Sequence, residues 1–263
     1  MKEKVGSHDI LFITLDSLRY DVAVDCWQKG LTPHFQALLG SVWEKRHTPG
    51  NFTYAAHHAF FAGFLPTPAD PKADKMRLMA TEFAGSETIG PQTQLFQTSN
   101  IVEGFRDYDY RTLCIGGVGF FNKKTALSSV LTDCFDESHW SDDLGVICPD
   151  SAMNQFRLAS ERIKGIGQDE RYFLFMNMSA IHQPNYFYKA GSTEDTIDSH
   201  AAALQSVDQG LPILLKAMRQ RERPVFYIIC SDHGTAYGED GFYGHRLSHD
   251  TVWTVPYADG ILE

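Results

Sequence analysis

The sequence predicts an α/β fold with a mainly parallel central sheet and helices on both faces. One observation is that short, largely apolar runs stop abruptly at polar side chains. The run 11–15 is followed by Asp16, and the run 225–230 is followed by Ser231 and Asp232. Such runs are typical of strands that are buried on both faces of a parallel sheet. A second observation is that they alternate with segments of helical periodicity, the order that builds such a sheet.

Each element is predicted from its local pattern. Residues 33–39 are expected to form a short helix, because Thr32 can act as its N-cap and Pro33 suits the first helical position. Residues 198–221 are expected to form a long helix, because their apolar positions recur at helical spacing. The remaining expectations are strands at 10–15, 111–117, 172–178 and 225–230, helices at 55–64 and 151–164, a polar surface excursion at 67–94 and a final apolar segment at 254–257.

Length and composition limit the classes of protein that need to be considered. The 263 residues fit one large α/β domain spanning 1–263, and a hydrophobic fraction of 43% is enough for a substantial core. The net charge of −10 argues against nucleic acid as a partner, because nucleic-acid-binding proteins usually carry a basic face. A small anionic substrate remains compatible with this charge, because a bound metal would supply local positive charge.

Compartment is predicted from the N-terminus and the cysteines. The first nine residues lack a signal-peptide pattern, and the apolar run 10–15 is too short to span a bilayer, so no membrane association is expected. The five cysteines are odd in number and show no C-x-x-C spacing, which argues against a disulfide framework or a structural zinc site. We therefore expect reduced thiols in the cytoplasm, with Cys114 and Cys230 in the core.

Polar residues that follow two of the predicted strands suggest a metal site. Ligands bind beyond the carboxyl ends of parallel strands, so Asp16 and the pair Asp232-His233 should meet at one edge of the sheet. Two carboxylates and an imidazole are suitable ligands for a divalent ion. The alternatives are a helix cap for Asp16 and a capped turn with a surface imidazole for Asp232-His233. Nearby, Arg19 and Asp21 are expected to form an ion pair, with substrate contact by Arg19 as the alternative.

A hydroxyl and several histidines complete the set of candidate residues. Thr53 comes just before the predicted apolar helix, where the helix dipole favours an anion and a metal contact could make the hydroxyl a nucleophile. From spacing alone, a simple N-cap role for Thr53 is favoured. His182 follows a predicted strand, and His245 follows the Asp232-His233 turn across a Gly-rich segment. Spacing does not sort the roles of His57, His58, His182 and His249.

These segments resemble the alkaline phosphatase and sulfatase superfamily, and especially its small, cytoplasmic, sulfatase-like bacterial hydrolases. The resemblance runs from Ser7 to Tyr257. It is carried by Leu15-Asp-Ser-Leu-Arg-Tyr-Asp21, by Thr53 through Pro66, by His182-Gln-Pro, and by Ser231-Asp-His-Gly234 with Gly238-Glu-Asp-Gly241. It implies that Asp16, Thr53, Asp232 and His233 hold a divalent metal. It also implies that Thr53 is the nucleophile and that His182 and His245 bind the substrate phosphate or a second metal.

The chain also departs from the pattern of true sulfatases. Those enzymes carry Cys or Ser in a Cys-x-Pro-x-Arg type motif that matures to formylglycine. Here Thr53 occupies that position, with Ala55 and His57 in place of Pro and Arg. Threonine cannot become formylglycine, which disfavours sulfate-ester hydrolysis by that route. Ser17 also replaces the second of the paired acids that sulfatases carry after the first strand.

The sequence therefore predicts a metal-dependent hydrolase that cleaves a phosphate mono- or diester of a small soluble substrate through Thr53. The expected cofactor is one or two divalent ions, with Zn²⁺ preferred and Mn²⁺ as the alternative. His182 and His245 would neutralise charge on the phosphate oxygens or protonate the leaving group. One alternative is a phosphotransferase or phosphomutase that uses the same site. Another is a non-catalytic metal- or phosphate-binding protein, which the presence of Thr53 disfavours. The sequence does not predict the oligomeric state.

Overall fold

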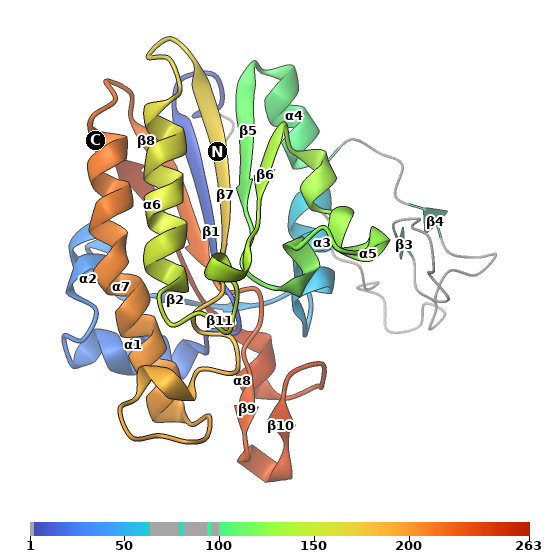
Figure 1. Ribbon diagram of the computed structural model, residues 1–263, viewed down its shortest axis with the longest axis vertical. Coiled ribbons are helices and arrows are strands. Elements are labelled where there is room, and N and C mark those ends of the chain that lie inside the picture. The colour runs from blue at the N-terminus through green and yellow to red at the C-terminus, as the bar shows by residue number, and fades with distance from the viewer. Residues whose placement is uncertain (1–2, 64–78, 81–93, 96–99) are drawn as a thin grey trace.

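A seven-stranded sheet forms the centre of the computed structural model, which describes residues 3–63, 79–80, 94–95 and 100–263 (Figure 1). The strand order is β2-β11-β8-β1-β7-β5-β6. The strands from β8 to β6 run parallel, and β11 pairs antiparallel with both β8 and β2, so the predicted mainly parallel α/β fold is confirmed. The strand bounds are β1 Asp9–Leu15, β2 Glu44–His47, β5 Tyr110–Ile115, β6 Glu137–His139, β7 Arg171–Met178, β8 Val225–Cys230 and β11 Thr254–Leu262.

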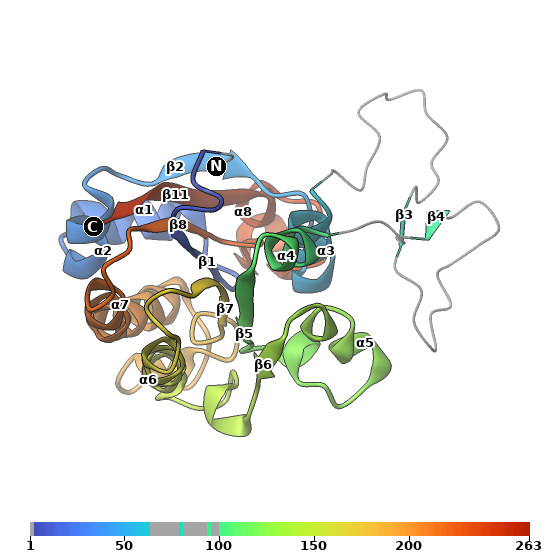
Figure 2. The ribbon, with the colours of Figure 1, turned by 90° about the horizontal axis from the view of Figure 1, so that it is seen from above.

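Helices cover both faces of the sheet, as Figure 2 shows from above. One face carries α1 (Tyr20–Gln28), α2 (Pro33–Leu39), α6 (Ser151–Lys164) and α7 (Ile197–Arg219). The opposite face carries α3 (Thr53–Ala62) and α4 (Ile101–Asp107). The shorter elements are α5 (Ala126–Ser129), α8 (Asp250–Trp253), a hairpin of β9 (Ala236–Tyr237) and β10 (Tyr243–Gly244), and the pair β3 (Met79–Ala80) and β4 (Gln94–Leu95).

The continuous apolar runs of the strands feed two separate cores. Successive side chains of a strand point to opposite faces of its sheet. Leu11 and Ile13 of β1 therefore pack with α1, α2, α6 and α7, whereas Ile10 packs with α3 and α4. On the α3 face, the Phe175 ring of β7 lies 5.0 Å from Phe61 and 5.5 Å from His57, measured between ring centroids. This aromatic packing fixes α3, and with it Thr53, against the sheet.

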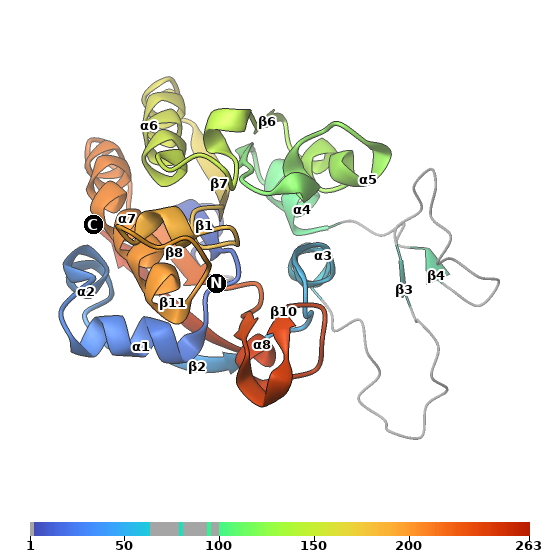
Figure 3. The same ribbon diagram turned by 60° about the horizontal axis from the view of Figure 1, so that its bottom comes forward.

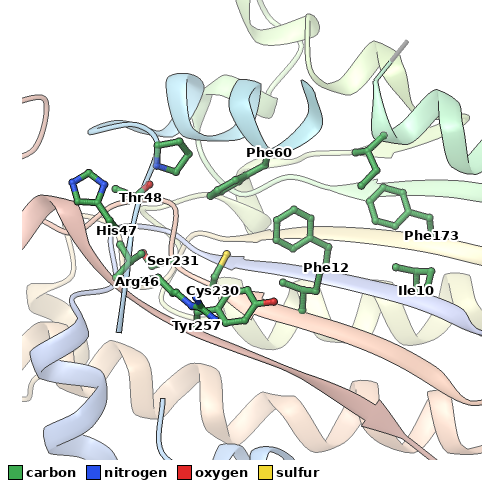
Figure 4. A pocket seen from close by; sticks show the side chains of 14 residues that line it. Ile10, Phe12, Arg46, His47, Thr48, Phe60, Phe173, Cys230, Ser231 and Tyr257 are labelled. Atoms are coloured by element: carbon green, nitrogen blue, oxygen red, sulfur yellow. The ribbon is translucent and has the colours of Figure 1, made fainter. Parts of the chain in front are cut away.

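A cavity of about 490 Å³ lies on the same face, between the sheet, α3 and the segment that follows β2. Figure 4 shows Phe60 of α3 and Phe12 of β1 along one side, with Cys230 and Tyr257 at another part of the wall. Its lining includes Thr48 and Ser231 but not Thr53. Thr53, the candidate nucleophile, lines a different cavity.

The structure differs from the sequence-based prediction in several elements. The helix predicted at 55–64 begins at Thr53 and ends at Ala62, and the final segment is a nine-residue strand that extends to Leu262. Helices α1 and α4 and strands β2 and β6 were not predicted. β2 is exposed along its length and exists because its main chain pairs with β11, which its sequence does not indicate. Most of the excursion predicted at 67–94 lies outside the described residues.

All five cysteines are free, and Cys114 and Cys230 are buried, as predicted for core thiols. Within the described part of the chain, none of the helices combines the length and apolarity needed to cross a lipid bilayer.

Candidate metal and nucleophile site

The structure brings Asp16, Asp232 and His233 together at the carboxyl edge of the sheet, the edge turned toward the viewer in Figure 3. Their strands β1 and β8 are direct neighbours, with Thr14 paired to Cys230, so the residues that follow each strand emerge side by side. One potential ligand atom from each of the three residues lies within 4.8 Å of the others, and all three side chains are fully buried. Asp16 does not cap α1, whose N-cap is Arg19, so the helix-cap alternative is wrong.

Thr53 joins this cluster as the first residue of α3. Its Oγ1 lies 3.4 Å from Asp16 Oδ2 and 3.4 Å from His233 Nε2, and the residue is 2% exposed. The N-cap of α3 is Phe52, so the alternative in which Thr53 acts as N-cap is also wrong. Gly50 allows the preceding loop to press against the first turn of α3, because a Cβ there would lie 2.5 Å from the main-chain nitrogen of Ala56.

The electrostatics of the cluster favour a bound cation. Burial, together with the charge of Asp16, raises the pKa of Asp232 well above its usual range. Burial alone would also raise the pKa of Asp16, but His182, His233 and the amide of Asn177 outweigh this effect and lower it. Asp232 Oδ2 is buried and has no hydrogen-bond partner within the described residues. A buried, unpartnered carboxylate oxygen facing a second carboxylate fits a divalent ion, so the residues present suit the metal that the sequence predicts.

The main chain sets the orientation of the His233 ring. Nδ1 donates a hydrogen bond to the Gly234 carbonyl at 2.8 Å, which leaves Nε2 with its lone pair facing the cluster. Nε2 lies 3.5 Å from Asp232 Oδ2 and 3.8 Å from Asp16 Oδ1. Gly234 is required at this turn because a Cβ would lie 1.8 Å from the carbonyl oxygen of Thr251.

Two residues that support the cluster were missed by the sequence analysis. Ser17, in the left-handed region with φ of 65°, donates from its main-chain nitrogen to Asp232 Oδ1 at 3.1 Å and from its hydroxyl to Asp16 Oδ1 at 3.0 Å. Asn177 donates to Asp16 Oδ2 at 2.9 Å and accepts from the Val118 nitrogen at 3.1 Å. Asn177 could have been suspected, because it is a polar residue near the carboxyl end of an otherwise apolar strand.

His182 and His245 face a second cavity, which they share with Thr53. This cavity has a volume of about 360 Å³. The ring centroids of His182 and His245 are 5.4 Å apart, and those of His245 and His233 are 4.5 Å apart. Burial and the neighbouring His233 and His182 lower the pKa of His245 to about 4. The structure therefore places both imidazoles in the wall of the cavity that Thr53 also lines, and their catalytic roles remain predictions.

The structure also shows the surroundings of the other three histidines whose roles the sequence spacing did not predict. His57 is fully buried behind Thr53, where its Nδ1 contacts the Thr53 carbonyl at 2.7 Å. His58 stacks on Tyr54 with ring centroids 5.9 Å apart. His249 is the N-cap of α8 and accepts a hydrogen bond from the Thr251 nitrogen at 3.2 Å. His57 and His249 therefore have local structural partners that the sequence did not reveal.

The predicted ion pair of Arg19 and Asp21 is present at 2.6 Å, and Arg19 also pairs with Glu239. The Glu239 contact ties the turn after β9 to the N-terminus of α1. The same hairpin also contacts α7 through Tyr237, whose hydroxyl lies 2.9 Å from His200 Nδ1. The segment that connects His233 to His245 is thus anchored to two helices.

Comparison with known proteins identifies the family of this chain. The model of the family described as Sulfatase matches residues 8–258. The chain belongs to the sulfatase family. It is 24% identical over 185 residues to the capsular polysaccharide biosynthesis protein RkpI of Rhizobium meliloti (strain 1021), an alignment that covers 70% of this chain and 32% of RkpI. The chain thus spans about a third of the length of that relative.

Solved structures show the same fold at low sequence identity. The putative sulfatase yidJ from Bacteroides fragilis matches with a TM-score of 0.67 and 17% identity, covering 99% of this chain and 69% of that one. The C-terminal periplasmic domain of the phosphoethanolamine transferase EptC from Campylobacter jejuni matches with a TM-score of 0.66 and 12% identity, covering 97% and 80%. A protein in the alkaline phosphatase superfamily from Vibrio parahaemolyticus matches with a TM-score of 0.62 and 17% identity, covering 97% and 60%.

Proposed function

We propose that this sulfatase-family protein cleaves a phosphate mono- or diester of a small anionic substrate, with Thr53 as the nucleophile and a divalent metal as cofactor. The observation that carries the proposal is the position of the Thr53 hydroxyl, 3.4 Å from both Asp16 Oδ2 and His233 Nε2, the two residues that cluster with Asp232. A hydroxyl in contact with two buried metal-ligand candidates, at the start of a ten-residue helix, is placed to act as an activated nucleophile.

Asp16, Asp232, His233 and the Thr53 oxygen would hold the ion. A bound divalent ion supplies Lewis-acid chemistry, which lowers the pKa of a hydroxyl and offsets the charge of a phosphate. Zn²⁺ is our first choice, with Mn²⁺ as the alternative, and one or two ions are compatible with the proposal. A related EptC domain from Escherichia coli, which shares the fold at 12% identity, has been crystallised in complex with Zn.

The proposed reaction has two steps. Thr53 Oγ1 loses its proton and attacks the phosphorus in line, so that an Oγ1–P bond forms, the bond from phosphorus to the leaving alcohol breaks, and the leaving alcohol ends with one proton. His182 donates a proton to the leaving oxygen or hydrogen-bonds the phosphate oxygens. His245, whose pKa is lowered to about 4, is neutral near pH 7 and hydrogen-bonds these oxygens; both rings line the cavity that Thr53 also lines. A water molecule then attacks phosphorus, the Oγ1–P bond breaks, and the Thr53 hydroxyl is restored.

A phosphotransferase is the second candidate. It differs only in the second step, in which an alcohol replaces water as the acceptor. Several structural neighbours are named phosphoethanolamine transferases, and RkpI is named for capsular polysaccharide biosynthesis, which supports this candidate. Product analysis with an added polyol acceptor separates the two, because a transferase would yield a new phosphate ester of the polyol and a hydrolase would yield only the hydrolysis product.

The proposed compartment is the cytoplasm, because all five thiols are free. Neighbours of the same fold are periplasmic domains, so fractionation of cells that produce the natural protein is the direct test. The proposed partner is the small ester substrate, without nucleic acid.

Substitution of Thr53 tests the covalent step. Thr53→Ala should abolish turnover and only weaken metal binding, because three ligands remain. Thr53→Ser is the matched control: it keeps the hydroxyl and should retain part of the activity. Rapid quenching followed by mass spectrometry should find phosphate on Thr53 of the wild type. Near-wild-type turnover of Thr53→Ala would refute covalent catalysis.

A further inference from the structure

The cavity beside Thr53 has an unusual distribution of charge. Apart from the two imidazoles, much of its wall comes from the segment 118–128, which supplies apolar side chains together with hydroxyl and amide groups. Val146 adds a further apolar side chain. Among the described residues that line it, Arg246 carries a permanent charge and none carries a carboxylate. A substrate bound against Thr53 therefore meets a positive charge with no negative counterpart in the wall.

The main chain and an aromatic ring hold Arg246 close to the nucleophile. Its main-chain nitrogen donates to the Asn51 carbonyl at 2.8 Å, and its guanidinium carbon lies 5.3 Å from the centre of the Phe52 ring. Phe52 directly precedes Thr53 in the chain. The backbone of Arg246 adopts a φ of 69°, a left-handed conformation that few residues other than glycine take up. The turn after His245 is thus shaped to bring this side chain over the start of α3.

Arg246 also differs from the arginines that serve the fold. Arg19, Arg106 and Arg221 each pair with a carboxylate at 2.9 Å or closer. Arg246 forms no ion pair with the described residues and is exposed at the mouth of the cavity. A guanidinium that lies against an aromatic face, with no carboxylate partner there, remains available to an incoming anion.

We propose that Arg246 determines substrate specificity by selecting phosphoesters whose alcohol part is neutral or anionic and rejecting those whose alcohol part carries a cationic amine. The inference rests on the proposed function, because it concerns the substrate that Thr53 attacks. Its physical basis is Coulombic: two positive charges that approach each other at the mouth of the cavity repel, and no carboxylate in the described wall offsets them. A phosphoethanolamine group, which several neighbours of the same fold are named for transferring, would be disfavoured here.

A pair of isosteric esters isolates this charge effect. 4-Nitrophenyl phosphorylcholine and 4-nitrophenyl 3,3-dimethylbutyl phosphate have the same shape and leaving group, and differ in carrying a quaternary nitrogen or a carbon. With the metal-loaded wild type, we expect kcat/KM to be about ten-fold higher for the neutral ester. Arg246→Lys should keep most of this preference. Arg246→Ala should reduce it several-fold, and Arg246→Glu should reverse it toward the cationic ester.

Lys124→Ala is the matched control for net charge. Lys124 lies near the same region, 4.4 Å from the centre of the Trp140 ring and paired with Asp142, but does not line the cavity. Its removal should leave the preference unchanged. Equal preference in the wild type, Arg246→Ala and Arg246→Glu would overturn the role of Arg246, since the apolar wall alone would then explain any selection.

A binding measurement keeps this result distinct from failure of the proposed function. Calorimetry with phosphocholine and 3,3-dimethylbutyl phosphate compares the two groups without turnover. If neither ester is cleaved by the wild type, the proposed function fails. The binding ratio, and its loss or reversal in Arg246→Glu, then decides separately whether Arg246 selects by charge.

Discussion

The Nδ1 atom of His57 lies 2.7 Å from the main-chain carbonyl oxygen of Thr53, one helical turn earlier. A carbonyl can only accept, so Nδ1 carries the proton and Nε2 accepts from the Thr14 hydroxyl at 2.8 Å. Burial lowers the pKa of His57 to about 4, so the ring is neutral near pH 7. A neutral imidazole thus links β1 to the first turn of α3.

We predict that His57→Gln lowers turnover about ten-fold or more and leaves metal content unchanged, because His57 positions Thr53 without being a ligand. The unfolding free energy should fall by about 1–3 kcal/mol, the cost of disturbing a buried hydrogen-bonded group. Kinetics, metal analysis and denaturant unfolding provide the three readouts. Thr14→Val removes the donor to Nε2 and should shift kcat in the same direction by less. Wild-type kcat in both variants would show that this hydrogen-bond chain does not position the nucleophile.

Removal of the buried Asp232 carboxylate should change the stability of the protein in opposite directions with and without bound metal. Asp232→Asn removes the repulsion between the two carboxylates that raises the pKa of Asp232. In the presence of a chelator, the free energy of unfolding of the variant should therefore exceed that of the wild type by about 1–3 kcal/mol. In excess Zn²⁺ the wild type should be more stable than the variant, because only the wild type gains stability from tight metal binding. Asp232→Ala should likewise lose most of its metal while remaining folded. Asp25→Asn, an exposed acid paired with Lys29, serves as the control. Full metal content in either Asp232 variant would rule out its assignment as a ligand.

His182→Ala and His245→Ala should keep the fold and lose most turnover, since both rings line the cavity beside Thr53. Circular dichroism and kcat/KM measure the two effects separately. His249→Ala is a contrasting variant: it removes the N-cap of α8, so it should cost about 1 kcal/mol of stability with turnover retained. A fully active His182 or His245 variant would remove that residue from the proposed machinery.

Stability should depend on pH through His200. Burial first, and then the charge of Arg19, lower the pKa of this ring from 6.5 to about 3. Between pH 6.5 and about 3, His200 is protonated in the unfolded chain but neutral in the native protein. Its contribution to the free energy of unfolding is therefore fully present above pH 6.5 and is lost as the pH falls. By pH 5 the loss from this ring should reach about 2 kcal/mol.

His200→Gln keeps a hydrogen-bonding side chain but does not titrate. The variant should be less stable than the wild type at pH 7.5, and the gap should narrow by about 2 kcal/mol at pH 5. Denaturant unfolding at several pH values measures both curves. Parallel curves would show that His200 does not titrate on unfolding.

The sequence alone predicted the elements whose patterns are strongest. The strands before Asp16 and Asp232 are continuous apolar runs, and their burial on both faces of a parallel sheet requires such runs. The carboxyl-edge rule for parallel sheets then placed Asp16, Asp232 and His233 together before their distances were known. The family was likewise predicted from the sequence, and the match over residues 8–258 confirms it.

Tertiary contacts decided what no local pattern encodes. β2 is a fully exposed four-residue segment, and it is a strand only because its main chain pairs with β11. Asn177 and Ser17 orient the acids through hydrogen bonds between segments distant in sequence. Arg246 owes its position to a turn and a ring contact rather than to a motif. Hydrophobic periodicity reports how each segment meets the core, whereas the partners of individual polar atoms are fixed only when the segments pack together.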